Sequence, residues 1–563
     1  MKPLAPLHKE TKEYIYPVSR REVCIKVEFA FPGNYDIRLV YWKRFRKITK
    51  KSKRMLAVAK FGTSKYYTVN LGFSDVIRYL NYIFEIKVGH RSYYYSPEGL
   101  TFSYPLKNFE FQNINESDVF IVPNSYAGQL AYHIIPERYH NGNKDNDPID
   151  VVAWDATPTR TNYFGGDLQG IAMKIPYLKE LGVKTIFLTP IFKASSNHKY
   201  DTVDYYAIDP VFGTEEEFRH LVSALHNEGM RLILDGVFNH IGYYSRQFQD
   251  VISKGKKSPY WRWFFVYGDK VDTEKINYEC VGDYMWMPKL NTANEDVQTF
   301  FEEVGRYWIE RFQIDGWRLD VGDELDFYFR KHFRRVIKKH HPEVLIMAET
   351  WHNGLDLLRG DEVDSIMNYR LRDAIIDYLV KKSISLNTFI ERIETICFDY
   401  PKQVHHILYN LIDSHDTPRF LTVAGNDKSL LFLAIVMQML LPGMPVIYYG
   451  DEIGMAGETD PLCRAGMAWD YQDSEVYDFY KKMIEIRSSC GELATGDFAI
   501  IHNHQDVFAF TRSNNEHVTL VIINPQDKAK TFALDALKAI ELGFTGEIRL
   551  DVAPKSYVIR RNI

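Results

Sequence analysis

The sequence predicts an α/β protein: a (β/α)8 TIM barrel with an inserted subdomain after its third strand, flanked by N-terminal and C-terminal β-sandwich domains. The 563-residue length is enough for about three domains. Residues 1–122 and 480–563 contain short runs in which apolar and polar residues alternate, as in half-buried antiparallel strands. Between them, short apolar runs alternate with amphipathic segments, which is typical of parallel strands connected by helices.

The composition excludes several classes of protein. With 45% hydrophobic and 25% charged residues, the chain is an ordinary globular protein and not a disordered one. A net charge of −5 offers no basic field for nucleic acid. The longest apolar stretch, residues 430–449, is broken by Gln438 and Pro442, so we expect a buried helix and strand and no membrane span. The first residues lack the apolar core of a signal peptide, which favours a cytoplasmic location.

The barrel prediction rests on eight apolar runs within residues 123–479. The runs lie at 132–139, 184–190, 231–240, 316–321, 344–350, 364–369, 405–416 and 445–452. Segments of helical period lie between them, for example at 215–229 and 297–312. The longest gap, about 241–296, far exceeds the roughly 2–6 residues of an ordinary βα loop, so it predicts the inserted subdomain.

Charged side chains stand where several of these runs end, at positions that face the active site in such barrels. Burying charge in an apolar strand is costly unless the charge has a partner or a purpose. Arg318 and Asp320 are two residues apart and share one face of a strand, so the guanidinium should keep Asp320 ionised. Glu349 follows an apolar run, where burial favours the protonated form that a general acid requires.

An ionised and a protonated carboxyl on adjacent strands form the catalytic pair of a retaining glycosidase. The alternative interpretation is an ion-pair network that only closes the top of the barrel. Further charged strand ends at Asp235 and Asp413 favour the catalytic interpretation, because a structural network alone would not require so many.

Four motifs carry a family resemblance. They are DGVFNH (235–240), GWRLDVGDE (316–324), EVLIMAETWH (343–352) and LIDSHDTPR (411–419). In this order they resemble the four conserved regions of the α-amylase superfamily. MPKLN (287–291) and DPLCRAGMAWD (460–470) resemble markers of the neopullulanase, cyclomaltodextrinase and maltogenic amylase subgroup. The resemblance covers essentially the whole chain.

The resemblance implies a role for each matched residue. Three carboxyls would catalyse: Asp320 as nucleophile, Glu349 as acid/base, and Asp416 as the group that grips sugar hydroxyls and helps distort the ring. Five residues would bind substrate, with Tyr200 as a platform and Trp351 on the leaving-group side: Tyr200, His240, Arg318, Trp351 and His415. Asp235 would instead be a structural partner of Arg318.

A calcium site is the only metal site expected. NGNKDND (141–147) and GGD (165–167) offer hard oxygen ligands suited to Ca²⁺, although the same residues are common in polar turns. Some members of the subgroup bind calcium at corresponding positions, which implies a structural site here. Its ligands would be Asn141, Asn143, Asn146, Asp147, Gly165 and Asp167. No organic cofactor is expected.

The resemblance implies hydrolysis of α-1,4 bonds in cyclodextrins and short maltooligosaccharides, with pullulan and starch left open. Two alternatives remain: an α-glucosidase or transglycosylase with the same carboxyls, and an inactive glycan-binding relative, which should lack one of them. A homodimer through the N-terminal starch-binding-like domain is also implied, and that domain is rich in Tyr, a residue enriched in interfaces. The competing interpretation is that its rings pack its own core or bind sugar. They are Tyr41, Trp42, Phe45, Tyr66, Tyr67, Tyr93, Tyr94 and Tyr95.

Overall fold

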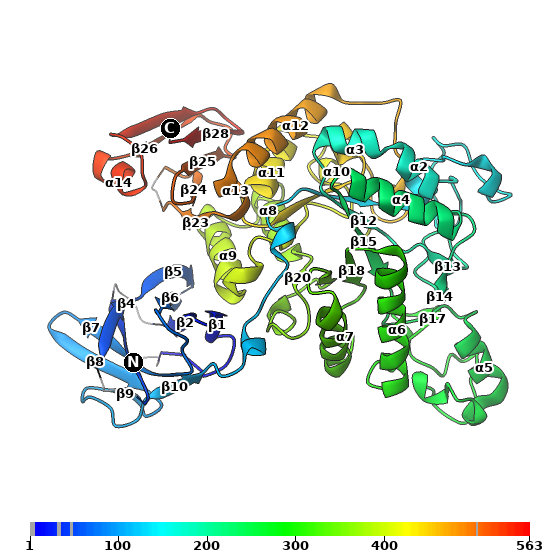
Figure 1. Ribbon diagram of the computed structural model, residues 1–563. Helices are drawn as coiled ribbons and strands as arrows, with labels where there is room; N and C mark the ends of the chain where they lie inside the picture. Colours follow the sequence, from blue (N-terminus) through cyan, green and yellow to red (C-terminus); the bar gives the residue numbers. More distant parts are fainter. Residues whose placement is uncertain (1–5, 31–34, 46–48, 63, 503–504, 563) are drawn as a thin grey trace. The chain divides into compact units, whose positions relative to one another are not determined.

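The computed structural model describes residues 6–30, 35–45, 49–62, 64–502 and 505–562 of the chain (Figure 1). Its internal contacts divide the chain into two compact units. The first consists of Met1–Val122, Leu355–Asp361 and Ile384–His405. The second consists of Pro123–Gly354, Glu362–Ser383 and His406–Ile563, and it contains the barrel.

The second unit is built on eight parallel strands that follow one another around the barrel in chain order. They are β11 (Ala131–Ile134), β12 (Thr185–Leu188), β15 (Arg231–Gly236), β18 (Gly316–Leu319), β19 (Leu345–Ala348), β20 (Ser365–Ile366), β21 (Tyr409–Asn410) and β22 (Met444–Tyr448). β11 pairs with both β12 and β22, and a parallel bridge between Met367 and Tyr409 joins the two remaining edges. The predicted barrel is therefore confirmed.

Each predicted strand is present but shorter than its apolar run. The run at 132–139 ends as a strand at Ile134, because Pro136 occupies the first position of the helical turn α1 (Pro136–Tyr139), where a missing N–H costs nothing. The run at 405–416 contributes only β21, and its polar end turns into the loop that carries His415.

Amphipathic helices surround the barrel. They include α2 (Leu168–Met173), α3 (Ile175–Leu181), α4 (Glu215–Asn227), α6 (Glu295–Phe312), α7 (Phe327–His340), α8 (Tyr369–Leu379), α11 (Lys428–Leu440) and α12 (Ser474–Ser489). Thr214 and Glu217 form a capping box that starts α4 at the predicted place. Residues 430–449 form most of α11 and then β22, as predicted. No helix within the described ranges is long and apolar enough to cross a membrane.

Two segments are inserted after strands of the barrel. The predicted insertion after β15 contains α5 (Arg246–Lys254) and the short antiparallel pair β16 (Cys280–Val281) and β17 (Tyr284–Pro288). An antiparallel hairpin, β13 (Phe192–Ala194) and β14 (Thr202–Ile208), follows β12 and was not anticipated from the sequence. Its connecting loop carries Tyr200.

The first unit holds two antiparallel sheets around one core, as the sandwich prediction requires. One sheet contains β1 (Ile15–Ser19), β2 (Glu22–Phe29), β6 (Ser64–Gly72) and β5 (Leu56–Phe61). The other contains β4 (Lys51–Arg54), β3 (Asp36–Lys43), β7 (Tyr79–Val88), β8 (Arg91–Ser96), β9 (Gly99–Thr101) and β10 (Phe109–Gln112). Buried residues of both sheets, such as Ile25 and Leu39, share the core. The same unit includes α9 (Leu386–Asp399), which packs against β5 and whose Phe398 carbonyl accepts a hydrogen bond from buried Lys26.

The C-terminal part of the second unit is also antiparallel. β23 (Asp497–Ile500), β24 (Phe508–Ser513), β25 (Val518–Asn524) and β28 (Ser556–Arg561) form one sheet. β26 (Lys530–Leu534) and β27 (Ile548–Val552) form a hairpin, and α14 (Ala536–Glu541) lies between them in the chain. Buried Ile522, Phe532 and Ile548 form a shared core.

Candidate active site

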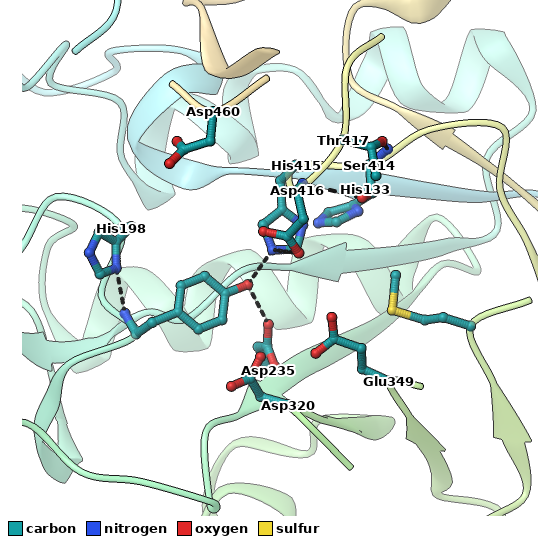
Figure 2. A network of polar contacts seen from close by, with 12 residues as sticks. His133, His198, Asp235, Asp320, Glu349, Ser414, His415, Asp416, Thr417 and Asp460 are labelled. Atoms are coloured by element: carbon teal, nitrogen blue, oxygen red, sulfur yellow. Dashed lines mark hydrogen bonds and ion pairs between the residues drawn. The ribbon is translucent and has the colours of Figure 1, made fainter. Parts of the chain in front are cut away.

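Neighbouring strands of the barrel bring the predicted carboxyls together at one end. Asp235 on β15 is the register partner of Arg318 on β18. Asp320 follows β18 directly and Glu349 follows β19 directly, so all three carboxyls stand at the carboxyl ends of adjacent strands. Figure 2 shows Asp235, Asp320 and Glu349 grouped on one side, with His415 and Asp416 facing them.

Arg318 joins the three carboxyls. Its side chain is completely buried, and its Nη1 lies 3.0 Å from Asp235 Oδ1 and 2.6 Å from Asp320 Oδ1. Its Nη2 lies 2.8 Å from Glu349 Oε2. The contacts with Asp320 and Asp235 were predicted; the structure adds Glu349, so one guanidinium is the shared partner of both predicted catalytic carboxyls.

The surroundings of Asp320 favour its ionised form less than the sequence suggested. Burial raises the pKa of Asp320 well above its usual range, and the charges of Glu349 and Asp235 oppose the effect of Arg318. Burial likewise raises the pKa of Asp235 to about 6. Arg318 does favour the ionised form of Asp320, as predicted, but three buried carboxyls share this one guanidinium and its effect does not outweigh burial.

Glu349 accepts hydrogen bonds that its apolar strand did not indicate. Its Oε2 accepts the backbone N–H of Val321 at 2.9 Å in addition to Arg318, and its Oε1 accepts the indole N–H of Trp351 at 3.1 Å. Val321 has a φ of 46°, in the left-handed region that a β-branched residue rarely occupies. This backbone conformation accompanies the donation from Val321 to Glu349, and it lies directly after Asp320.

Tyr200 connects the two sides of the site. Its hydroxyl donates to Asp235 Oδ2 at 3.0 Å and lies 2.6 Å from His415 Nε2. His240 holds the loop below, because its Nε2–H donates to the Tyr200 carbonyl at 3.1 Å. Burial lowers the pKa of His240 to about 3, so the ring is neutral. The structure thus brings Tyr200, His240 and His415 into one hydrogen-bonded group.

Asp416 is held by two basic side chains. Its Oδ2 lies 3.0 Å from His415 Nε2, and its Oδ1 accepts from Arg464 Nη2 at 3.0 Å. Burial alone would raise the pKa of Asp416, but His415 and Arg464 hold it well below the usual range. Arg464 also donates to the His415 carbonyl at 2.7 Å. Its contact with the site was missed, although it stands in the DPLCRAGMAWD motif noted above.

A cavity of about 440 Å³ opens over these groups. The predicted residues that line it are Tyr200, His240, Asp320, Glu349, Trp351, His415 and Asp416. Arg318 lies beneath the cavity and not on its wall, so it acts on the carboxyls and not at the surface of the cavity. Trp351 is 42% exposed and stacks on Tyr369 with ring centroids 4.0 Å apart. Asp460, Arg464 and Tyr284 also line the cavity and were not assigned from the sequence.

The predicted calcium ligands lie in two adjoining loops. Asn141 Nδ2 donates to Asp147 Oδ1 at 2.7 Å, and a Cβ on Gly165 would lie 2.4 Å from that same oxygen, so these three residues are in close contact. Asp167 accepts the N–H groups of Gly142 and Gly170 and caps α2. Asn143 accepts the Asp145 N–H, and Asn146 lies near Asp167. The structure therefore brings the predicted set together.

The fold and site together define a class: a barrel glycosidase with paired carboxyls at the strand ends. Comparison with known proteins agrees. The family model for the alpha-amylase catalytic domain matches residues 133–472. A cyclomaltodextrinase of Thermoanaerobacter pseudethanolicus is 40% identical, over 99% of both chains. An intracellular maltogenic amylase of Bacillus subtilis is 40% identical over 80% of this chain and 79% of its own. A solved cyclomaltodextrinase structure, 32% identical, superposes with a TM-score of 0.93 over 99% of both chains.

The chain therefore belongs to the alpha-amylase family and is a glycoside hydrolase. The similarity to cyclomaltodextrinases and to a maltogenic amylase confirms the subgroup resemblance of the sequence motifs.

Proposed function

We propose that this protein is a retaining α-glucan hydrolase that cleaves α-1,4 bonds of cyclodextrins and short maltooligosaccharides. The observation that carries the proposal is the single guanidinium of Arg318 in contact with both Asp320 and Glu349. Two carboxyls that share one guanidinium suit the shorter spacing of about 5–5.5 Å that retaining enzymes use. The name of the Thermoanaerobacter relative, a cyclomaltodextrinase, supports the substrate class.

The reaction divides into two displacements at the anomeric carbon. Asp320 attacks that carbon while Glu349 donates its proton to the glycosidic oxygen, so the glycosidic bond breaks and a bond to Asp320 forms. Glu349 then takes a proton from water, whose oxygen attacks the same carbon and releases Asp320. Two inversions leave the product in the α configuration.

Asp416 has a different part, since His415 and Arg464 keep it ionised. An ionised carboxylate accepts hydrogen bonds from sugar hydroxyls and can hold a distorted ring. Tyr200 and His240 shape the wall of the same subsite, and Trp351 offers an exposed ring face on the leaving-group side.

Substitution of the two central carboxyls tests the mechanism. Asp320→Asn and Glu349→Gln should each lower kcat by several orders of magnitude and leave thermal unfolding nearly unchanged. Glu324→Gln is the matched control, because Glu324 is half exposed and forms an ion pair with Lys289 at the surface. Near-normal turnover in either central variant would refute the assignment, and so would β-anomers in fresh product. Incubation with γ-cyclodextrin, pullulan and soluble starch side by side ranks the substrates and separates hydrolysis from glycosyl transfer.

We also propose a structural Ca²⁺ site in the loops 141–147 and 165–167. The donor set fits a hard cation: Asn141 Oδ1 and Asn146 Oδ1 are buried without a hydrogen-bond donor within the described part of the chain. The ion would be held by Asn141, Asn143, Asn146, Asp147, Gly165 and Asp167, and would supply a cross-link between loops. Calcium should raise the unfolding temperature relative to a chelator in the wild type and in Asp145→Asn, but not in Asp147→Asn. If the unfolding temperature of the wild type is the same with calcium and with a chelator, the proposed calcium site is contradicted.

We propose further that the N-terminal domain forms a homodimer. The rings that first suggested an interface do not all support it, since Tyr67 and Tyr95 are buried in the domain core. The support comes from Phe45 of that group (72% exposed) together with two further exposed apolar side chains, Phe102 (67%) and Leu106 (95%).

Sedimentation of the full chain tests this assembly. The wild type should sediment as a dimer at micromolar concentration, and Leu106→Asp should shift it to a monomer. Leu537→Asp is the matched control, because Leu537 is 79% exposed on α14 in the other unit. A monomeric wild type, or a dimer that Leu106→Asp leaves intact, contradicts the proposal.

We infer a cytoplasmic location, which the name of the Bacillus subtilis relative, an intracellular maltogenic amylase, supports. Fractionation of the source cells should place the hydrolase activity in the lysate. Activity confined to the culture medium contradicts the inference.

A further inference from the structure

A second cavity, distinct from the catalytic one, lies on the second unit. It has a volume of about 530 Å³ and is bordered by β14, the start of α5 and the first turns of α6. Figure 1 shows these three elements beside one another at the junction between the barrel and the inserted subdomain. None of its lining residues lines the catalytic cavity. Junctions of this kind are common places for ligand sites.

One wall of this cavity is a continuous row of aromatic rings. Tyr260 packs edge-to-face on Trp263 with centroids 5.1 Å apart, and Trp263 packs on Phe300 at 5.4 Å. Phe300 in turn packs edge-to-face on Tyr206 at 5.9 Å. Trp263 is buried, whereas Tyr260, Phe300 and Tyr206 are half-buried and line the cavity. The row is thus anchored at its centre and presents apolar ring surface along the cavity.

Charged side chains form the rest of the lining. Asp204, Asp296 and Glu303 are exposed, and Arg246 begins α5 on the other side. Within the described ranges none of these four side chains forms an ion pair, in a protein whose surface otherwise has many. Burial raises the pKa of Tyr206 to about 12, with further contributions from Glu303 and Asp204, so its hydroxyl remains a donor.

This combination selects the chemistry of the ligand. Three carboxylates repel anions, and the guanidinium of Arg246 on the same cavity disfavours cations. A neutral molecule with many hydroxyls can bind to both kinds of charged group in this cavity, because hydroxyls donate to carboxylates and accept from a guanidinium. The apolar ring row suits the C–H faces of pyranose rings. A volume of about 530 Å³ is ample for a short oligosaccharide.

We propose that this cavity is a second, non-catalytic binding site for an α-glucan chain, formed by Tyr206, Tyr260 and Phe300 with Arg246 and Glu303 at its edges. The choice of an α-glucan rests on the proposed function, since the sugar that the enzyme cleaves is the sugar it meets. The site retains a glucan on the surface of the catalytic unit, so it favours longer chains over short ones.

Oligosaccharide binding to an inactive enzyme tests the proposal. Calorimetric titration of the full-length Asp320→Asn/Glu349→Gln variant with maltotetraose should reveal two binding events per chain. Adding Tyr260→Ala should weaken one event roughly tenfold, since the loss of one stacking ring is worth that much. Glu303→Gln should weaken the same event without disturbing the ring row, because Glu303 is exposed. In the active enzyme, Tyr260→Ala should raise the ratio of KM for long glucans to KM for maltotriose.

The matched control is Tyr267→Ala. Tyr267 is a 65% exposed ring of the same inserted subdomain that lines neither cavity. It should leave both binding events unchanged. Tyr205 is kept in all variants, because its hydroxyl donates to the carbonyls of Val237 and His240 and so supports the catalytic site.

The possible failures are distinguishable. A wild type that hydrolyses α-glucans while the inactive variant binds one maltotetraose per chain overturns this inference alone. Two binding events that both survive Tyr260→Ala and Glu303→Gln also overturn it. A wild type that hydrolyses no α-glucan instead overturns the proposed function.

Discussion

Replacing Arg318 with methionine tests whether one guanidinium holds the proposed catalytic carboxyls together. Methionine keeps much of the length of the side chain and removes its charge. Arg318 is fully buried and contacts Asp235, Asp320 and Glu349 at 2.6–3.0 Å. Removal of one partner from a buried ion pair costs about 3–5 kcal/mol, because the remaining charge is left uncompensated. Three carboxyls share this partner, so we expect Arg318→Met to lower the free energy of unfolding by at least about 4 kcal/mol near neutral pH.

The free energy of unfolding that Arg318→Met loses should become smaller as the pH falls. Burial raises the pKa of Asp235 to about 6 and that of Asp320 well above its usual range, and loss of the cation would raise both further. A carboxyl whose pKa is higher in the folded than in the unfolded state binds its proton more tightly when folded. Protonation therefore stabilises the folded variant as the pH falls through the folded pKa. Arg318→Met should therefore lower the free energy of unfolding most at about pH 7.5 and clearly less at about pH 5.

Urea unfolding followed by tryptophan fluorescence at both pH values measures the effect. Arg487→Met is the matched control: Arg487 is also buried, but it donates to the carbonyls of Gly128, Met439 and Gly443. Burial lowers the pKa of Arg487 to about 9, so its charge does not change between the two conditions. Arg487→Met should lower the free energy of unfolding by the same amount at both pH values. An Arg318→Met cost below about 1 kcal/mol, or one that pH leaves unchanged, refutes the reasoning.

Three further predictions follow from single contacts. At Val321 glycine should be more stable than alanine by about 1 kcal/mol in urea unfolding, because a Cβ is strained at a φ of 46°; a more stable alanine variant contradicts this. Burial lowers the pKa of His8 to about 4, so stability falls as pH drops from about 6.5, by up to about 3 kcal/mol. His8→Gln should flatten that slope in thermal unfolding at several pH values, and an unchanged slope contradicts it. Arg464→Met should raise the pKa of Asp416 and move the acid limb of kcat/KM to higher pH; a wild-type profile would show that Arg464 does not hold Asp416.

The barrel strands and the carboxyls at their ends were predictable because each is indicated by a short segment of the sequence. A parallel strand buried on both faces reads as a short apolar run, and a charge at its end is visible in the same run. The pairing of Asp235 with Arg318 then follows from strand order, since β15 and β18 are neighbours. The lengths of the strands were overestimated, because an apolar run continues through the loop that carries His415 after the ladder has ended at Asn410.

Contacts made by loops across long separations were not predictable in this way. Arg464 reaches Asp416 from 48 positions along the chain, through a loop whose path no periodicity describes. The segment that contains α9 lies between barrel strands in the sequence, yet it belongs to the N-terminal unit. Lys26 looks like an ordinary strand residue in the sequence, and only its burial against the end of α9 reveals its partner.

The surroundings of the proposed catalytic pair show most clearly what a sequence lacks. Reading along β18 gives one cation beside one carboxyl and suggests an ionised Asp320. In three dimensions the same cation serves three carboxyls, and Glu349 gains N–H donors from Val321 and Trp351. The donors lie on the residues directly after the strands, so their direction depends on backbone angles such as the φ of Val321. Because a carboxyl's charge depends on the sum of these partners, catalytic roles can be assigned from motifs, but the location of the proton requires the folded geometry.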